Sequence, residues 1–583
     1  MENVCLISDF SDKMKRIALG LNIGPEYIIS NQIHENEKDY HTWLNTEFQE
    51  KNIEKIIIPV SLSDDGTVNT NGLLLGLHIR LNYELPVSKR LIPIIFLTNF
   101  TVENLIKKNQ FDRDNNSQNL IFTKGVYFSS FLIEDIIHSV TNAKESLDIE
   151  YSRLFLEKIN IHRKDTVGGH DIANTWGCFK LAQVAGIKDK IFELDIISKH
   201  LKQLYAKFLI CTNESYSPKT LVDLQPIKCT GKKILFIDDK SDEGWGLLMK
   251  EIFKAAGTNF VSIDSSPYKA DDYHRSFKDF EGFYCECLSH VGQDWDLIII
   301  DLRLNPDKED IDNEMISPTD FSGYKLIDEF LKANAGYQII VFTASNKIWN
   351  VNAASKRGAA AYYIKESPEF NYTVKETQKH YEDFKKDVTN CFQKNYLRDI
   401  FKRNTNLVEK IDNLPDTDLG DELKNQITLA YELLKISSTQ TQFAYAYISL
   451  YMIIELINNA FYKKTSGDRW IIEDGEALLD WSYGKNAKIY THTNITVSTN
   501  KPPEWRKLAG IYFQLWNGKD HTFIHDLSVL ITKRNGFVHN DKSILDIRDT
   551  DKKGNTIYPN HDIYTANGFI KLYDHIEKLI GYL

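Results

Sequence analysis

The chain has 583 residues, of which 42% are hydrophobic, 12% aromatic and 26% charged, and its formal net charge is −11. This length exceeds what one hydrophobic core supports, and the aromatic content argues against a disordered chain. The negative net charge argues against a protein coated in positive potential, so contact with nucleic acid would need a local basic patch.

Short apolar runs separated by helical patterns mark the first part of the chain. The runs that we interpret as buried parallel strands are 4–8, 55–60, 91–98 and 119–124. Alternation of strand and helix predicts a flavodoxin-like, doubly wound parallel sheet, with its site at the carboxyl ends of the strands. We assign residues 1–142 to this first α/β domain.

A helical connector is expected over residues 143–228. It contains the sequence GGHDIANTWG, in which His170 and Asn174 share one face if the segment is helical. This pattern resembles the H-box of some sensor histidine kinases, and the resemblance implies that His170 carries phosphate. The alternative is a helix N-terminus at which Asp171 favours the helix dipole. No ATP-binding kinase module is recognised in the sequence, so a phosphorelay would need an outside kinase.

The same rhythm of strands and helices returns over residues 229–372. The predicted strands are 234–238, 296–300, 338–344 and 360–365, with helices at 244–256 and 324–333. The spacing of the strand ends is similar in the two α/β regions. We therefore predict a duplicated fold with two parallel sheets.

Polar residues follow the strands of this second predicted sheet. They are Asp238 and Asp239, Asp301, Thr343 and Lys365. Because parallel strands end at one edge, these side chains are expected to converge. Carboxylates are suited to holding Mg²⁺, and a central carboxylate can attack phosphorus as a nucleophile. The lysine and the threonine hydroxyl would bind the remaining phosphate oxygens.

This constellation resembles the receiver domain of two-component response regulators over residues 231–370. The resemblance implies that Asp301 is phosphorylated and that Asp238 and Asp239 hold Mg²⁺ together with the carbonyl of Arg303. It also implies that a histidine kinase or a small phosphodonor acts as partner. The alternative is a flavodoxin-like domain in which these acids are incidental.

Two further features of residues 229–372 bear on this resemblance. Tyr362, three residues before the lysine, fits the rotameric switch aromatic of the family. Between Leu304 and Ser322 there is an acidic insertion that departs from the family pattern. We expect its carboxylates to lie beside Asp301 and to change metal affinity, donor access or the lifetime of the acyl phosphate.

The first α/β region resembles a degenerate receiver. It keeps Asp9, Thr98 and Lys124 in the corresponding places, but Ser8 replaces the first acid and Pro59 replaces the acceptor. Proline can neither attack phosphorus nor bind a metal through its side chain. We expect this copy to serve packing or dimerisation.

Residues 373–583 are expected to form an all-α domain. Its predicted helices are 372–410, 420–436, 439–463 and 525–534. The fold class expected for the whole chain is thus multidomain, α/β followed by all-α.

Near the end of this helical region Arg534, Asn535 and His539 occur in the sequence KRNGFVHN. An arginine, an adjacent polar residue and a histidine five positions after the arginine resemble the signature of HEPN-type ribonucleases. The resemblance implies metal-independent RNA cleavage, in which His539 transfers protons, Arg534 stabilises the charged phosphorane and Asn535 orients a partner. It also implies a homodimer, because two such motifs usually face each other.

Alternatives to a nuclease remain open for the C-terminal region. It is either a catalytic HEPN domain, a non-cleaving HEPN-like module that binds RNA or protein, or a helix that ends at Gly536 with an exposed His539. On the first interpretation the chain is a phosphorylation-regulated ribonuclease, of a kind found among toxins and phage-defence effectors. On the second it is a signalling adaptor without hydrolytic activity.

The cysteines and the apolar segments bear on the compartment. The one close cysteine pair, Cys285 and Cys287, has the wrong spacing for a zinc knuckle or a CxxC redox motif. The first ten residues lack the features of a signal peptide, and the apolar segment 443–461 carries Glu455. These observations predict a cytoplasmic protein with no membrane partner.

Overall fold

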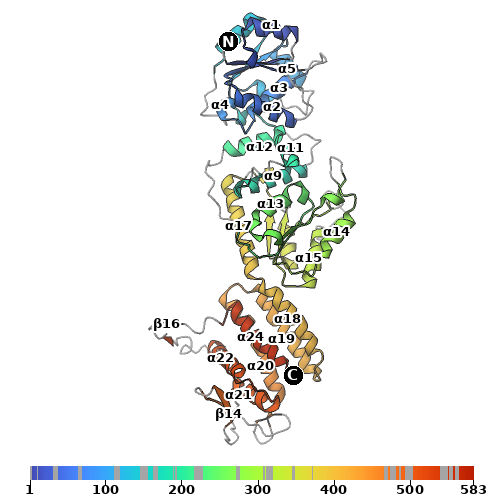
Figure 1. The fold of residues 1–583 in the computed structure, drawn as a ribbon, viewed down its shortest axis with the longest axis vertical. Coiled ribbons are helices and arrows are strands. Elements are labelled where there is room, and N and C mark those ends of the chain that lie inside the picture. Colours follow the sequence, from blue (N-terminus) through green and yellow to red (C-terminus); the bar gives the residue numbers. More distant parts are fainter. Residues whose placement is uncertain are drawn as a thin grey trace. The chain divides into compact units, whose positions relative to one another are not determined.

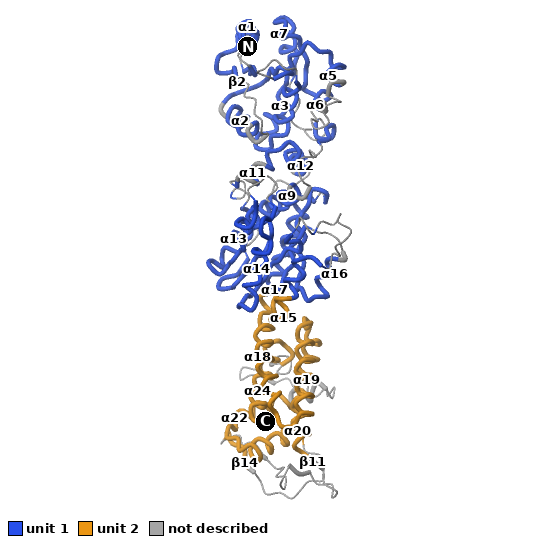
Figure 2. Tube along the Cα trace, turned by 90° about the vertical axis from the view of Figure 1, so that its right-hand side faces the viewer, with its two compact units in different colours: residues 1–328, 339–391 blue, residues 329–338, 392–583 orange. Residues whose placement is uncertain are grey.

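The fold was analysed in a computed structural model of the chain. The structure describes residues 3–8, 11–30, 37–62, 69–109, 118–144, 155–161, 169–187, 190, 194–215, 227–270, 276–305, 309, 320–344, 348–370, 372–464, 470–472, 481–484, 488–492, 503–538, 549–550, 556–557 and 563–583. These residues divide into two compact units, shown in two colours in Figure 2. Unit 1 comprises residues 1–328 and 339–391, and unit 2 comprises residues 329–338 and 392–583. Our division of the chain into four domains remains a prediction.

The first sheet of unit 1 has five parallel strands in the order β2-β1-β3-β4-β5. The strands are β1 (Val4–Ser8), β2 (Ile28–Ser30), β3 (Lys55–Pro59), β4 (Ile94–Leu97) and β5 (Val126–Ser129). The helices that accompany them are α1 (Asp12–Gly20), α2 (Glu37–Glu50), α3 (Asn71–Arg80), α4 (Val87–Arg90), α5 (Val102–Asn109), α6 (Gln118–Ile121) and α7 (Ile133–Asn142).

Both faces of this sheet are covered, which explains why its strands are apolar without interruption. Ile56 and Ile58 of β3 belong to one cluster of buried side chains, together with Leu44 of α2. Ile57 belongs to a second cluster, together with Met14 of α1. Successive side chains of a strand point to opposite faces, so a strand between two helical layers has no polar face.

The connector is helical, with α9 (Gly169–Val184), α11 (Asp195–Leu201) and α12 (Leu204–Ser215). It leads into a second sheet, which lies in the green and yellow part of the chain in Figure 1. This sheet has five parallel strands in the order β7-β6-β8-β9-β10. These strands are β6 (Ile234–Ile237), β7 (Phe260–Ser262), β8 (Leu297–Ile300), β9 (Ile339–Thr343) and β10 (Ala361–Ile364). The accompanying helices are α13 (Trp245–Ile252), α14 (Phe280–Ser289), α15 (Ser322–Ala333), α16 (Ile348–Arg357) and α17 (Val374–Gln393).

The strand orders of the two sheets are the same when each is counted along its own domain. In both, the second strand in the chain lies at one edge beside the first, and the third, fourth and fifth follow on the other side. The predicted fold class, two flavodoxin-like parallel sheets followed by a helical region, is confirmed.

Unit 2 is built on a long buried helix, α20 (Gln440–Phe461). Thr439 and Gln442 form a capping box at its start, which satisfies backbone N–H groups that a helix leaves unpaired. Around α20 lie α18 (Tyr396–Ile411), α19 (Thr417–Ile436), α21 (Glu504–Gly510), α22 (His521–Val538) and α24 (Ala566–Ile580). Among the described helices, none combines the length and the hydropathy that a bilayer crossing requires.

Three predicted elements differ from the structure. Residues 118–121 form helix α6, and the fifth strand lies at Val126–Ser129, so the strand predicted over 119–124 is wrong. The single helix predicted over 372–410 is two helices, α17 and α18, separated at 394–395. Strands β2 and β7 were not predicted, because a three-residue edge strand has too few residues to show a period.

Candidate functional site

Charged side chains meet at the carboxyl edge of the second sheet. Asp238 and Asp239 directly follow β6, and Asp301 directly follows β8. Thr343 is the last residue of β9, and Lys365 directly follows β10. The parallel registers of these strands bring all five residues to one edge.

Lys365 joins two of the carboxylates. Its Nζ lies 2.6 Å from Oδ2 of Asp301 and 2.8 Å from Oδ2 of Asp238. One oxygen from each of Asp238, Asp239 and Asp301 lies within 4.8 Å of the others. All these side chains are buried, so three acids face a single ammonium where water screens little.

Burial and the closeness of the carboxylates change the pKa values of the groups in this site. Burial, and next the carboxylate of Asp238, raise the pKa of Asp239 to about 8. Burial also raises the pKa of Asp238 to about 6, although Lys365 acts in the opposite direction. Burial alone would lower the pKa of the Lys365 ammonium, but the carboxylates of Asp238, Asp301 and Asp239 outweigh it and raise that pKa. The three acids of the site can therefore carry more negative charge than the Lys365 ammonium neutralises.

This donor set fits a divalent cation such as Mg²⁺. The three clustered groups are all carboxylates, the hard oxygen ligands that Mg²⁺ prefers, and no cysteine or histidine is among them. Burial is the larger cause of the raised pKa values of Asp238 and Asp239, and a divalent charge would offset the repulsion between carboxylates that adds to it. Asp238, Asp239 and Asp301 are the side chains that would hold it.

Three other predicted site residues lie around the acids. Thr343 is 1% exposed, and its register partner Ile364 immediately precedes Lys365. Burial raises the pKa of the half-buried Tyr362 hydroxyl, and Asp301 is among the groups that contribute. The backbone N–H of Arg303 donates to Oδ1 of Asp301 at 3.3 Å. The role of the Arg303 carbonyl as a metal ligand stays a prediction.

The described part of the acidic insertion shows one carboxylate in a structural position. Oε1 of Glu309 accepts the backbone N–H of Ser322 at 2.7 Å, at the first residue of α15. A carboxylate at a helix N-terminus interacts favourably with the helix dipole. Glu309 therefore stabilises the start of α15. The acids at 306–308 and 310–319 lie outside the described residues.

The loop that carries the acid pair, residues 238–244, is held by a residue that the sequence did not single out. Ser265, completely buried, donates through Oγ to the carbonyl of Asp239 at 2.9 Å, and its Oγ also lies 2.8 Å from Oδ1 of Asp242. The hydroxyl of Ser241 donates a hydrogen bond to the carbonyl of Ile263 at 2.7 Å. These bonds tie the acid loop to the segment after β7.

Lys269 completes this attachment. Its Nζ lies 2.9 Å from Oδ1 of Asp242 and 3.2 Å from Oε1 of Glu243, and its side chain is 1% exposed. A buried lysine between two acids is a signal of a functional or structural ion-pair network. In the sequence it is one lysine among many, and it lies 27 residues from Asp242. No local pattern could have identified it.

At the corresponding edge of the first sheet the acceptor chemistry is missing. Ser8 ends β1 and Pro59 ends β3, and the registers place them opposite each other, as Asp238 and Asp301 are placed in the second sheet. Asp9 lies outside the described residues. Thr98 follows β4 and is buried, as Thr343 is.

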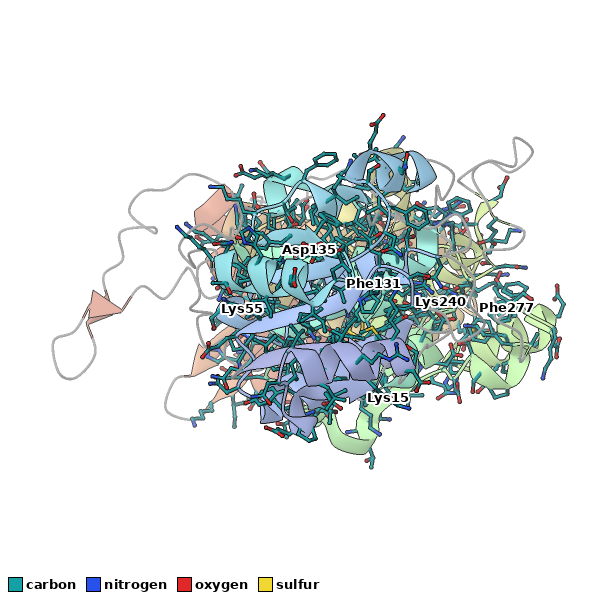
Figure 3. The ribbon with its side chains drawn as sticks, turned by 90° about the horizontal axis from the view of Figure 1, so that it is seen from above. Lys15, Lys55, Phe131, Asp135, Lys240 and Phe277 are labelled. Atoms are coloured by element: carbon teal, nitrogen blue, oxygen red, sulfur yellow. The ribbon has the colours of Figure 1, made fainter. Side chains whose placement is uncertain are left out.

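The prediction that Lys124 takes the position of the site lysine is wrong. Lys124 is exposed and precedes β5. Lys365 lies two residues after the register partner of Phe342, and Phe131 lies two residues after the register partner of Leu97. Phe131, labelled in Figure 3, therefore takes the lysine position, and Nζ of Lys13 lies 3.1 Å from its ring centroid.

A family model supports this interpretation of the first sheet. Residues 14–129 match the inactive receiver domain. The matched segment contains Pro59 at the position of Asp301, and Phe131, at the position of Lys365, lies two residues beyond it in the same domain, which we call the inactive receiver. No curated protein matches the sequence. The chain thus carries receiver-like domains, which are typical of signalling proteins.

The remaining predicted residues lie elsewhere. His170 is in the first turn of α9, and Asn535 is in α22, but the side chains of both are outside the described residues, as is His539 altogether. Arg534 lies in the last turns of α22. Its guanidinium is 4.2 Å from the ring centroid of Tyr451 and its Nη2 is 3.2 Å from Oε1 of Glu455.

Arg534 has only 11% of its side chain exposed, so its guanidinium is largely buried. The alternative in which the helix ends at Gly536 is wrong. Helix α22 continues to Val538, so Gly536 does not end it.

The raised pKa of Asp239 predicts a pH dependence of stability in metal-free protein. The folded state keeps a proton on Asp239 up to about pH 8, whereas the unfolded state releases it near its ordinary pKa of 3.8. The folded state binds more protons in this window, so stability falls as pH rises through it. Thermal unfolding in EDTA should show a lower midpoint at about pH 8 than at about pH 5. Asp239→Asn should flatten this slope and raise the midpoint at the higher pH. Equal slopes in both proteins would contradict the raised pKa of Asp239.

Loss of Lys269 should weaken the acid loop. Lys269→Met removes the cation that pairs with the nearly buried carboxylate of Asp242, whereas Glu243 keeps its ion pair with Lys240 at 3.0 Å. Breaking comparable buried pairs costs about 3–5 kcal/mol. We expect a lower unfolding midpoint and weaker Mg²⁺ binding by calorimetry. Lys250→Met, at an exposed lysine of α13, is the matched control and should change neither. If adding Asp242→Asn to Lys269→Met restores no stability, the ion pair is not the cause.

Proposed function

We propose that the second sheet domain is a receiver that accepts a phosphoryl group on Asp301 in the presence of Mg²⁺, and that it regulates the helical unit 2. The observation that supports this best is the meeting of Asp238, Asp239, Asp301 and Lys365 at one sheet edge, with Lys365 ion-paired to Asp301 at 2.6 Å. Asp301 is the most exposed of the three acids, at 6% against 4% and 0%, which suits the group that must meet the donor.

The proposed reaction is a transfer to an aspartate oxygen. A carboxylate oxygen of Asp301 attacks phosphorus of a phosphohistidine or of a small acyl phosphate. An O–P bond forms, and the donor's P–N or P–O bond breaks with its electron pair leaving on imidazole or acetate. Mg²⁺, when bound, would neutralise charge on the transferring phosphoryl group.

Lys365 and Thr343 are placed to receive the product. Lys365 contacts Asp301 before transfer, so its ammonium is already beside the position of the phosphoryl oxygens. Thr343 ends the neighbouring strand and would supply a hydroxyl to the same group. Tyr362, on the last strand, is positioned to follow the movement of Thr343 as the switch aromatic.

The inactive receiver would contribute structure. With Pro59 and Phe131 at the two positions that transfer requires, it cannot form the acyl phosphate. Packing or dimerisation is the remaining role, and it is consistent with an intact doubly wound core.

For unit 2 we propose a metal-independent ribonuclease of the HEPN type, acting on RNA as a homodimer and under receiver control. Arg534 supports this proposal because it is held at one point by the ring of Tyr451 and the carboxylate of Glu455 on the central helix α20. A planar guanidinium fixed in this way can stabilise a phosphorane. A place among phage-defence effectors rests on analogy with that family.

The same ion pair favours a second candidate, a non-catalytic adaptor. Glu455 neutralises Arg534, so a phosphodiester would have to displace a carboxylate that already occupies the guanidinium. A domain that never makes this exchange would bind a protein or RNA partner without cleaving RNA. The two candidates predict opposite results with RNA.

Phosphoryl transfer to Asp301 can be tested with acetyl phosphate. Wild-type protein should be labelled in Mg²⁺ and not in EDTA. Asp301→Asn should lose labelling by more than 100-fold, since the amide is not a nucleophile. Pro59→Asp, in the inactive receiver, should add no second label because the lysine is missing there. Labelled Asp301→Asn protein would exclude Asp301 as the acceptor.

RNA cleavage can be tested with total RNA and tRNA in EDTA, with and without earlier phosphodonor treatment. The nuclease predicts cleavage by wild type and loss of at least 100-fold in His539→Ala and Arg534→Ala. Arg403→Ala is the matched control, because Arg403 also stacks on a tyrosine, Tyr573, and pairs with acids in the same unit. Its activity should match wild type. Intact RNA under all conditions would favour the adaptor.

A further inference from the structure

The connector helix α9 lies directly against the backbone beside the site lysine. A Cβ added at Gly177 would lie 2.8 Å from the carbonyl oxygen of Glu366 and 3.4 Å from its nitrogen. Glu366 immediately follows Lys365. Contacts this short leave no room for a side chain, so glycine is required here for α9 to approach the end of β10.

A hydrogen bond links α9 to the first residue of α13. Nε1–H of Trp245 donates to Oδ1 of Asn174 at 3.2 Å. Trp245 has 1% of its surface exposed, so this bond satisfies a donor that would otherwise be buried without a partner. Without Asn174 the indole would lose a fixed orientation.

Trp245 in turn lies beside the lysine of the acceptor site. Its ring centroid is 5.0 Å from Nζ of Lys365, within the range of a cation–π interaction. Phe342 contacts both, at 5.4 Å from the same ammonium and at 5.1 Å between ring centroids with Trp245. The ammonium is thus held by two acids on one side and by aromatic rings on another.

The connector also contacts the inactive receiver. Nζ of Lys180, on α9, lies 2.8 Å from Oδ1 of Asn213 on α12. On the same helix α12, Nζ of Lys207 lies 3.0 Å from Nδ1 of His78, a residue of α3. Contacts between described residues therefore run from Lys365 through α9 and α12 to the inactive receiver.

We propose that α9 is part of the phosphoryl-acceptor site: Asn174 positions Trp245, and Trp245 positions the ammonium of Lys365. The proposal rests on the proposed function of Asp301. A phosphoryl group on Asp301 attracts the ammonium away from Asp238, and the same motion must alter the contacts of Trp245 and Glu366 with α9. Since such coupling is reciprocal, loosening α9 must change how well the site accepts phosphate. Asn174 and Trp245 are positioning residues, because neither contacts the reacting atoms.

The experiment measures the rate of acetyl phosphate labelling in the full chain. Asn174→Leu removes the acceptor for Trp245 at similar volume, and Gly177→Ala forces a shift between α9 and Glu366. Each should slow labelling about tenfold, or ~1.4 kcal/mol in the barrier. The affinity for Mg²⁺ should stay within about twofold, because neither substitution removes any of the three acids that would hold it. Asn174→Gln keeps the amide oxygen and should restore part of the rate.

Two matched variants control for general effects of these substitutions. Gly420→Ala adds a methyl group to α19, where the nearest atom would be 3.5 Å away, in ordinary contact. Asn142→Leu changes an exposed asparagine at the end of α7. Both should label at the wild-type rate. Circular dichroism and the unfolding midpoint identify any variant that is not folded.

Hydrogen exchange gives a second measurement that needs no variant of α9. Phosphodonor and Mg²⁺ should change the exchange of α9 amides in wild type and leave α19 unchanged, and Asp301→Asn should show no change in α9. Wild-type rates in both α9 variants, or unchanged exchange in α9 of labelled protein, overturn the proposal while Asp301 stands. Failure to label wild-type protein overturns the proposed function and this proposal together.

Discussion

The arrangement of the second sheet domain depends on one buried ammonium. Lys365 stands between Asp238 and Asp301 at 2.8 and 2.6 Å, in surroundings where an unpaired carboxylate is strongly disfavoured. Even so, the three acids can carry more negative charge than this lysine neutralises. Burial, and next the neighbouring carboxylates, raise the pKa values of Asp238 and Asp239. The charges at this edge of the sheet are therefore not balanced. Binding of a divalent cation or of a phosphoryl group would change that balance. A change of charge at this edge must alter the contacts that hold Lys365 in place.

The doubly wound sheet makes that edge available. Its strands are sequestered by helical layers on both faces, so functional groups can gather only where the strands end. The two domains show that this fold fixes the order of the strands but not the residues at the strand ends. They share strand order and core construction, yet Pro59 and Phe131 occupy the acceptor and lysine positions in the inactive receiver. The same fold therefore supports an edge with three carboxylates and a lysine in one copy and an edge with Pro59 and Phe131 in the other.

Residues around the second site connect it to the neighbouring segments of its domain and to the connector. Ser265 and Lys269 hold the acid loop from the segment after β7, and Trp245 links the lysine to the connector. In unit 2, Arg534 is held by Tyr451 and Glu455 on the central helix. Both regions place a cation between an acid and an aromatic ring. This arrangement keeps a charged group in a fixed position at low conformational cost.

The sequence by itself determined the two α/β domains, the five residues at the strand ends and the helical character of unit 2, because strand periodicity and strand-end chemistry are local signals. It misplaced the fifth strand and Lys124, since a short helix and a short strand are equally compatible with the apolar run 119–124. Only the tertiary structure decided that Phe131 takes the lysine position, that Lys269 pairs with Asp242, and that Arg534 pairs with Glu455. Each of these depends on residues far apart in the chain meeting in space. No period or motif within one segment encodes such a meeting, because it is the packing of the helices and strands that selects the partners.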